Sequence, residues 1–436
     1  MIDTANCGAT ARNTVKRILI FPGGSEVGLE ILRSLAGSLH FQPVGATSEP
    51  DHSQVTYREV VPDIPWATDP RLVDNLAHVC RERDIHAIFP AHDEVSLVLS
   101  RAAEEGSLPV PIAGPGQRAC WLARSKSRTY DLLSDAIPVP APVEHVNHSL
   151  PVFAKPDRGQ GSKGARRIDT PDELAVALAD ESLVVREYLP GPELTVDCFT
   201  DRTATLRYWR ARTRTRLYSG ISARSEWVDV SLGDFAAVIS ERFGMRGAWF
   251  FQVKARANGE YVLMEVGARV AGTMGLSRAS GVNLPLLTLF DLDGQDVDIP
   301  ETDLNPILDR GLDPRFVLNL SYSQVYMDLD DCLILGDSVS TQAVKFLFQC
   351  RNRKIPVHLV TRHAADVEQT LHRFGLADLF ASIHHLTAGE PKSSVVEGTG
   401  AIFIDDSNRE REEVQRNAGA QVFSPQQLDV LIDDRA

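Results

Sequence analysis

VYMDLDDCL at residues 325–333 and AIFIDDSN at residues 401–408 are two apolar runs that end abruptly in aspartates. Such short apolar runs are typical of buried parallel strands. The carboxyl ends of these strands meet at one edge of an open α/β sheet, where ligands bind. We therefore expect the strand-end aspartates to converge on one Mg²⁺ and one phosphoryl group. These residues are Asp328, Asp330, Asp405 and Asp406.

Length, composition and charge limit the class of protein. With 436 residues, 43% of them hydrophobic and 24% charged, the chain predicts about two to four α/β units. A formal net charge of −14 argues against nucleic acid as the main partner, because phosphate-backbone binding needs a cationic surface. No signal-like run and no stretch of about 18 apolar residues is present, so we expect a cytoplasmic protein outside the membrane. Six cysteines without CxxC spacing fit a reducing compartment.

Residues 16–115 are predicted to form a Rossmann-like domain behind a disordered tail at residues 1–15. The glycine turn at residues 22–28 reads GGxxxG and departs from the GxGxxG fingerprint, which disfavours a nicotinamide site. His92, Asp93 and Glu94 follow a predicted strand at residues 87–90. They either contact a substrate or cap the next helix, and the sequence leaves both interpretations open.

Residues 116–320 carry several motifs suited to binding a nucleotide. The strand VFAKP at 152–156 contains one lysine and precedes the glycine-rich loop DRGQGSKG at 157–164. Glycines let backbone N–H groups approach phosphate oxygens, and the lysine adds a positive charge. Further on, Asn258-Gly259 predicts a hairpin between FFQVK at 250–254 and YVLMEVGAR at 261–269.

Together with the strand and acidic turn at residues 183–193, these motifs resemble the ATP-grasp superfamily over residues 16–320, closest to its carboxylate-amine ligase branch. The resemblance implies a Rossmann-like pre-ATP-grasp domain, an α+β ATP-grasp domain with a lid at about 130–190, and the cofactors ATP and Mg²⁺. It implies that Lys126 and Lys155 hold the phosphates and that the loop with Gly161 and Ser162 closes over them. It also implies that the backbone from Glu187 to Leu189 holds adenine and that Glu193 binds ribose.

By the same resemblance Gln252 and Glu265 look like the metal ligands, and Arg269 would neutralise the acyl-phosphate transition state. One position departs from the family pattern. Gly267 stands where the family usually has asparagine, and glycine offers no side-chain oxygen. A second Mg²⁺ is therefore expected to bind weakly, through water, or not at all.

The segment YWRARTRTR at residues 208–216 places an arginine at every second position. Side chains alternate along a strand, so Arg210, Arg212, Arg214 and Arg216 would share one face. That face either binds a multiply anionic substrate or is a solvated edge whose charges prevent aggregation. Arg224 and Arg278 are further candidates for holding a substrate carboxylate.

Residues 321–436 resemble the haloacid dehalogenase superfamily, with a doubly wound parallel sheet, and all four motifs occur in order between 325 and 436. The resemblance implies that Asp328 attacks phosphorus, Asp330 acts as acid and base, and Thr361 and Lys392 bind phosphoryl oxygens. It assigns Mg²⁺ to Asp328, Asp330, Asp405 and Asp406. Cys332 replaces a usual threonine, and the short spacings between motifs leave no room for a cap domain.

The resulting hypothesis is a bifunctional enzyme: an ATP-dependent carboxylate-amine ligase that proceeds through an acyl-phosphate, joined to a Mg²⁺-dependent phosphatase. Its partners would be a small carboxylate and an amine, anionic or phosphorylated, and a homodimer is possible by family analogy. Two alternatives remain open at this stage. One is an ATP-binding sensor or scaffold with one inactive unit, and the other is a pair of tethered enzymes acting on unrelated substrates.

Overall fold

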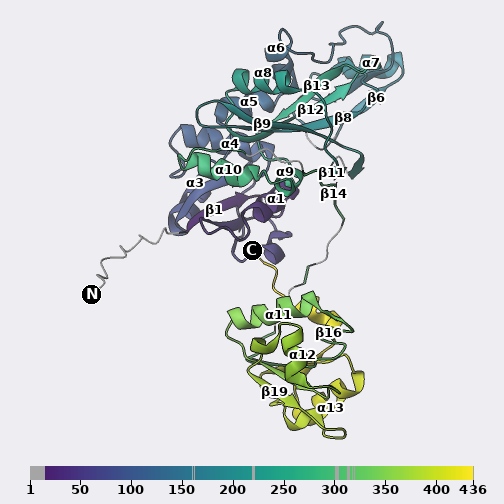
Figure 1. Cartoon of the computed structure of the whole chain (residues 1–436). Coiled ribbons are helices and arrows are strands. Elements are labelled where there is room, and N and C mark those ends of the chain that lie inside the picture. Colours follow the sequence, from purple (N-terminus) through teal and green to yellow (C-terminus); the bar gives the residue numbers. More distant parts are fainter. Residues whose placement is uncertain are drawn as a thin grey trace, which may run out of the picture. The chain divides into compact units, whose positions relative to one another are not determined.

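The computed structural model describes residues 15–159, 161, 163–218, 221–299, 304–311, 315–316, 318 and 320–435. The chain divides into two compact units, residues 1–312 and 313–435 (Figure 1). The predicted domain boundary near residue 115 falls inside the first of these units. The side chains of residues 216–221, the predicted tail at residues 1–14 and Ser162 lie outside the described residues.

A four-stranded parallel sheet of order β3-β2-β1-β4 opens the first unit. Its strands are β1 (Lys16–Phe21), β2 (Phe41–Ala46), β3 (Val60–Val61) and β4 (Ile85–Pro90). The apolar residues of β1 and β4 are buried, as expected for parallel strands covered on both faces. The helices are α1 (Glu26–Leu35), α2 (Ser53–Thr56), α3 (Leu72–Glu82) and α4 (Asp93–Glu104).

Two further sheets follow in the first unit. The smaller sheet has the order β6-β5-β7 and follows α5 (Gln117–Ala123) and α6 (Lys126–Leu133). Its strands are β5 (Val152–Pro156), β6 (Arg166–Ile168) and β7 (Leu183–Glu187), and α7 (Pro171–Leu178) lies between β6 and β7 in the sequence. The larger, of order β13-β12-β8-β9, is antiparallel and comprises β8 (Glu193–Thr200), β9 (Leu206–Thr213), β12 (Gly247–Ala255) and β13 (Tyr261–Gly267). The predicted Asn258-Gly259 turn joins β12 to β13, with Gly259 at φ 87°.

The arginine-rich segment does not form one continuous strand. β9 ends at Thr213, and Arg216 begins the separate strand β10 (Arg216–Tyr218). The reason is that β8 begins at Glu193, and its Leu194 already pairs with Thr213, so β9 runs out of partner strand. β10, β11 (Ile221–Ser225) and β14 (Leu308–Asp309) form a small sheet, and the remaining helices are α8 (Gly233–Phe243), α9 (Gly275–Ala279) and α10 (Leu284–Leu292).

The second unit is built on a five-stranded parallel sheet of order β19-β18-β15-β20-β21. Its strands are β15 (Gln324–Met327), β18 (Val357–Thr361), β19 (Ser382–His385), β20 (Ala401–Ile404) and β21 (Gln421–Phe423). One face packs against α11 (Thr341–Asn352), α12 (Val367–Arg373) and α14 (Leu428–Leu431), and the other against α13 (Asn408–Ala418). A short hairpin, β16 (Ile334–Leu335) and β17 (Ser338–Val339), follows β15. β15 is central, so its end lies beside those of β18 and β20.

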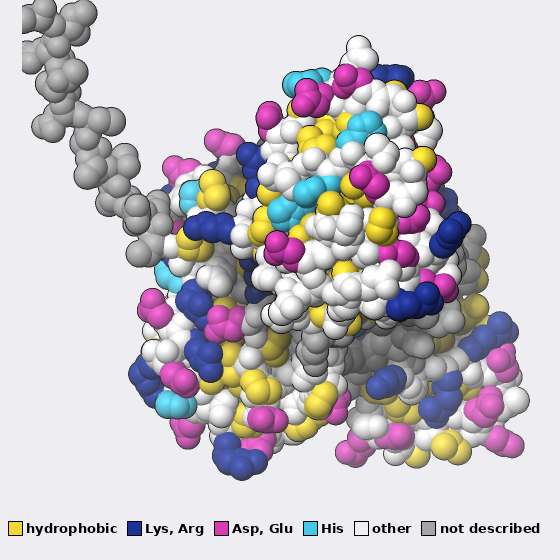
Figure 2. Space-filling view, turned by 90° about the horizontal axis from the view of Figure 1, so that it is seen from below, with side chains coloured by type: hydrophobic (Ala, Val, Ile, Leu, Met, Phe, Trp, Pro, Cys, Tyr) yellow, Lys and Arg dark blue, Asp and Glu magenta, His cyan; other side chains and the backbone are white. Residues whose placement is uncertain are grey.

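The surface carries charges of both signs (Figure 2), and the described cysteines are buried. Acidic and basic side chains are interspersed on the face drawn in Figure 2. The five cysteines in the described part of the chain are unbridged and buried. Within the same residues, no helix combines the length and apolar character that a membrane crossing requires.

Candidate active site

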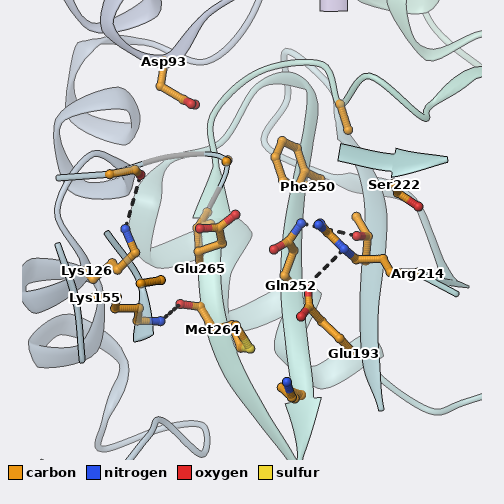
Figure 3. Close-up of a pocket in the computed structure, with 18 of the residues that line it drawn as sticks. Asp93, Lys126, Lys155, Glu193, Arg214, Ser222, Phe250, Gln252, Met264 and Glu265 are labelled. Atoms are coloured by element: carbon orange, nitrogen blue, oxygen red, sulfur yellow. Dashed lines mark hydrogen bonds and ion pairs between the residues drawn. The ribbon is translucent and has the colours of Figure 1, made fainter. Parts of the chain in front are cut away.

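A cavity of about 440 Å³ lies in the first unit between the β13-β12-β8-β9 sheet, the β6-β5-β7 sheet and the start of α6 (Figure 3). It brings together nine described residues that the resemblance assigned to ATP, metal or catalysis. These are Lys126, Lys155, Gly161, Glu187, Leu189, Glu193, Gln252, Glu265 and Arg269. Arg212 and Arg214 line the same cavity, and Ser162 falls outside the described residues.

The two lysines enter the cavity from α6 and β5. Lys126 Nζ donates to the carbonyl oxygens of Asp157 and Gly159, at 3.4 and 3.3 Å, and Lys155 Nζ donates to Met264 O at 3.1 Å (Figure 3). Burial lowers the pKa of Lys126, and it lowers that of Lys155 to about 8 although Glu265 opposes the shift. Two buried cations that donate to neutral carbonyl oxygens are well suited to bind a polyphosphate.

The side chains expected near adenine and ribose are held by arginines. Glu187 accepts hydrogen bonds from Arg256 Nη2 at 2.6 Å and from Ala141 N at 2.9 Å, so its carboxylate is fully engaged. The expected backbone contact of Glu187 to Leu189 with adenine stays a prediction. Glu193 Oε1 lies 2.9 Å from Arg214 Nε.

Two cross-strand pairs between β12 and β13 form part of the cavity wall. Gln252 lies opposite Glu265, and Phe250 lies opposite Gly267. The Gln252 amide is oriented so that its NH₂ donates to Glu265 Oε1 at 3.0 Å, while its oxygen accepts from Arg214 Nη1. Of these four positions, only Glu265 offers a carboxylate to a divalent cation.

Arg269 is bound to an acid at the start of α4. Its Nε and Nη2 donate to the two carboxylate oxygens of Asp93 at 2.7 and 2.9 Å. Burial disfavours the charged guanidinium, but Asp93 more than offsets this effect and the pKa of Arg269 is raised. The helix-cap interpretation of residues 92–94 is confirmed, because His92 Nδ1 accepts from Glu94 N at the start of α4. Asp93 lines the cavity, and its contact with a substrate stays a prediction.

The candidate substrate arginines separate into two groups. Arg212 is fully buried and donates to both oxygens of Asp197 at 2.9 Å, while Arg214 contacts Glu193, and both arginines line the cavity. The others contact protein groups and do not line it: Arg210 stacks on Trp227, Arg224 pairs with Glu226 and Asp309, and Arg278 pairs with Glu30. The prediction that one strand presents all four arginines to a single ligand is therefore wrong, because Arg210 does not line the cavity and β9 ends at Thr213, before Arg214 and Arg216. The Arg216 side chain itself lies outside the described residues.

A second cluster of acids lies in the second unit. Carboxylate oxygens of Asp328, Asp405 and Asp406 lie within 4.8 Å of one another. Lys392 Nζ lies 3.0 Å from Asp328 Oδ2 and 2.7 Å from Asp405 Oδ2. Burial raises the pKa of Asp328 and raises that of Asp405 to about 6, although Lys392 opposes both shifts. The buried Thr361 ends the neighbouring strand β18.

Asp330 lies outside this cluster of three and has a partner that sequence reasoning missed. His363 Nδ1 lies 2.9 and 3.0 Å from the two oxygens of Asp330, and His363 Nε2 lies 2.9 Å from Thr370 Oγ1. The side chain of Asp330 is 49% exposed. This placement suits proton transfer with a bound molecule better than the metal-ligand role also assigned to Asp330. The sequence signal that could have identified His363 is its position two residues after Thr361.

Comparisons with known proteins identify the fold around the first cavity. Residues 179–308 match the family described as "ATP-grasp in the biosynthetic pathway with Ter operon". Over 167 residues the chain is 26% identical to the phosphoribosylamine–glycine ligase of Synechocystis sp., a match that covers 34% of this chain and 40% of that enzyme. The chain thus spans less than half the length of this relative.

Solved structures agree on the architecture. The biotin carboxylase domain of Hydrogenobacter thermophilus 2-oxoglutarate carboxylase, in complex with MgADP, ADP and bicarbonate, has a TM-score of 0.55 at 14% identity, covering 67% of this chain and 73% of its own. Biotin carboxylase from Campylobacter jejuni scores 0.54 at 18% identity, covering 65% and 72%. N5-carboxyaminoimidazole synthetase from Staphylococcus aureus, complexed with ADP, scores 0.52 at 12% identity, covering 68% and 82%. At these identities the similarity shows an ATP-grasp fold.

Proposed function

Because the chain contains an ATP-grasp fold, we propose that its first unit is an ATP-dependent carboxylate-amine ligase that uses MgATP. The observation that carries the proposal is the meeting of Lys126, Lys155, Glu265 and Arg269 in one cavity. A carboxylate would attack the γ-phosphorus of ATP and release ADP, and an amine would then displace phosphate from the acyl-phosphate to form an amide. Bound Mg²⁺ would neutralise phosphate charge and orient the γ-phosphoryl group.

The side chains that line the cavity would position the substrates and neutralise phosphate charge. Lys126 and Lys155 would bind phosphate oxygens, and Glu265 would hold Mg²⁺. Arg269, kept in place by Asp93, presents its guanidinium to the charge that develops during phosphoryl transfer. Since Asp93 engages two of its nitrogens, the Arg269 side chain is oriented before the substrate arrives.

The substrate end of the cavity favours an anionic carboxylate. Arg212 lines it, and Arg212 Nη1 is buried without a hydrogen-bond partner among the described residues. A buried guanidinium N–H that lacks an acceptor is costly, so a substrate oxygen would stabilise it. We expect Arg212→Ala to raise the KM for the acid substrate about tenfold or more, with a smaller effect on the KM for ATP. Equal effects on both constants would place Arg212 in the nucleotide site.

ADP formation tests the ligase. We expect MgATP with pooled carboxylates and amines to yield ADP in a substrate-dependent manner, and Lys155→Met to reduce the rate at least about a hundredfold. Lys345→Met, which removes a half-exposed lysine of the second unit, is the matched control and should leave the rate unchanged. Nucleotide binding with no ADP release under any acceptor mixture would favour the ATP-binding sensor instead.

We further propose that the second unit is a capless, Mg²⁺-dependent phosphohydrolase of the haloacid dehalogenase type. The cluster of Asp328, Asp405 and Asp406 around Lys392 supports it, since three carboxylates can hold Mg²⁺ while one attacks phosphorus. Asp328 would form an aspartyl-phosphate, and Asp330, positioned by His363, would protonate the leaving oxygen.

Hydrolysis of an aryl phosphate tests the second unit. Mg²⁺-dependent phosphate release should fall below about a thousandth of the original rate in Asp328→Asn, because a carboxamide cannot form the intermediate. Asp337→Asn is the matched control, as Asp337 is almost fully exposed and pairs only at the surface with Arg373. Equal loss in both variants would contradict the assigned role of Asp328.

A further inference from the structure

The cavity wall between β12 and β13 is poor in metal ligands. On the paired positions that face the cavity, Gln252 lies opposite Glu265 and Phe250 opposite Gly267. A glutamine oxygen can coordinate Mg²⁺, but that of Gln252 accepts from Arg214 Nη1 while the amide nitrogen donates to Glu265. Glu265 is left as the one carboxylate of this group.

Position 267 cannot supply another ligand, because aromatic packing occupies its side-chain space. A Cβ placed on Gly267 would lie 2.2 Å from Cε1 and 2.3 Å from Cζ of Phe250. The ring is 6% exposed and lies 5.3 Å from the Arg269 guanidinium, measured from ring centroid to Cζ. Any larger residue at position 267 would have to displace this ring.

Arg214 brings a fixed positive charge to the same wall. Its Nε lies 2.9 Å from Glu193 Oε1 (Figure 3). With the Gln252 amide assigned by its hydrogen-bond partners, Arg214 Nη1 donates to the amide oxygen, so one amide group separates the guanidinium from Glu265. The Arg214 side chain is only 10% exposed. Unlike a metal ion, a guanidinium stays charged and bound at every physiological pH.

We propose that the cavity takes one divalent cation with its nucleotide, at Glu265, and that Arg214 supplies the positive charge that a second divalent cation would otherwise provide. The inference rests on the proposed function of the first unit. A triphosphate carries about four negative charges, of which one Mg²⁺ neutralises two. Lys126, Lys155 and Arg214 each bring a further positive charge to the cavity wall.

Counting metal ions per bound nucleotide tests the proposal. The full chain carrying Asp405→Asn, which disables the acid cluster of the second unit, is dialysed to equilibrium against Mn²⁺ and a non-hydrolysable ATP analogue. Protein-retained Mn²⁺ and nucleotide should stand in a ratio of one to one. A ratio of two to one would overturn the inference and leave the proposed ligase intact, whereas absence of retained nucleotide would overturn both.

Variants of Arg214 test the role of its positive charge. Arg214→Gln should weaken binding of the analogue about tenfold, and Arg214→Lys should recover most of the loss because the charge is kept. Arg224→Gln, which removes an arginine outside the cavity, is the matched control and should bind as tightly as the unaltered chain. Unchanged affinity in Arg214→Gln, or a failure of Arg214→Lys to recover affinity in a folded protein, would overturn the role of this charge.

Discussion

Lys155 shows how burial adjusts a single side chain for anion binding. It lies on β5, is 8% exposed, and donates to Met264 O. Desolvation alone would favour the neutral amine, whereas the nearby Glu265 carboxylate favours the ammonium form, and the net result is a pKa of about 8. A phosphate placed beside Lys155 would add a further negative charge and raise this pKa, so nucleotide binding should be coupled to proton uptake.

This coupling predicts a pH dependence with a definite sign. Below about pH 8 Lys155 is mostly charged and binding takes up few protons, while above it the neutral amine must gain a proton first. The affinity for an ATP analogue should therefore fall about tenfold between about pH 7 and about pH 9. Titration calorimetry in buffers of different ionisation enthalpy measures the uptake directly. Lys155→Met should bind more weakly and lose most of this slope, and an unchanged slope would assign the effect to another group.

At the scale of elements, the β12–β13 hairpin determines what the cavity wall can bind. Its register sets Phe250 against Gly267 and Gln252 against Glu265. The packing of Phe250 therefore constrains position 267, and the same hairpin places Glu265 near Lys126 and Lys155.

The contact between Phe250 and Gly267 predicts a stability effect. Gly267→Ala should lower the free energy of unfolding of the first unit by about 1–3 kcal/mol, because the added methyl group forces the ring to move. In a Phe250→Ala background the same change should cost much less, since the two effects are coupled. All five tryptophans lie in the first unit, so tryptophan fluorescence during urea unfolding reports on it alone. Gly311→Ala, which meets no neighbour, is the control, and equal losses with and without Phe250 would contradict the packing argument.

The sequence predicted this hairpin and the strands that end in aspartates because their signals are local. Asn258-Gly259 identifies the turn, and the two predicted apolar runs form β15 (Gln324–Met327) and β20 (Ala401–Ile404), which end directly before Asp328 and Asp405. The end of β9 was missed, since it depends on where the partner strand β8 begins. The pair Asp93–Arg269 joins residues 176 positions apart, and no local pattern reveals it. The filling of position 267 by Phe250 was likewise hidden, because it requires the cross-strand register.

At the scale of the whole molecule, each unit contains its own complete set of candidate groups. The lysines, Glu265 and Arg269 all belong to the first unit, and Asp328, Lys392 and Asp405 to the second. No candidate residue is shared. Changes in one site should therefore leave the chemistry of the other unaltered, and a common substrate or product would link the two proposed reactions.

Asp328→Asn separates the possible links in the intact chain. The side chains are nearly equal in size, so the fold should persist, while loss of the nucleophile and of one negative charge near Lys392 stops phosphate release. The ligase reaction should continue at its original rate. If the phosphatase acts on the ligase product, the variant accumulates an amide one phosphoryl group heavier than the normal product, which mass spectrometry detects. An amide of unchanged mass would instead show that the second unit acts on another molecule, and the description as two tethered enzymes would then hold.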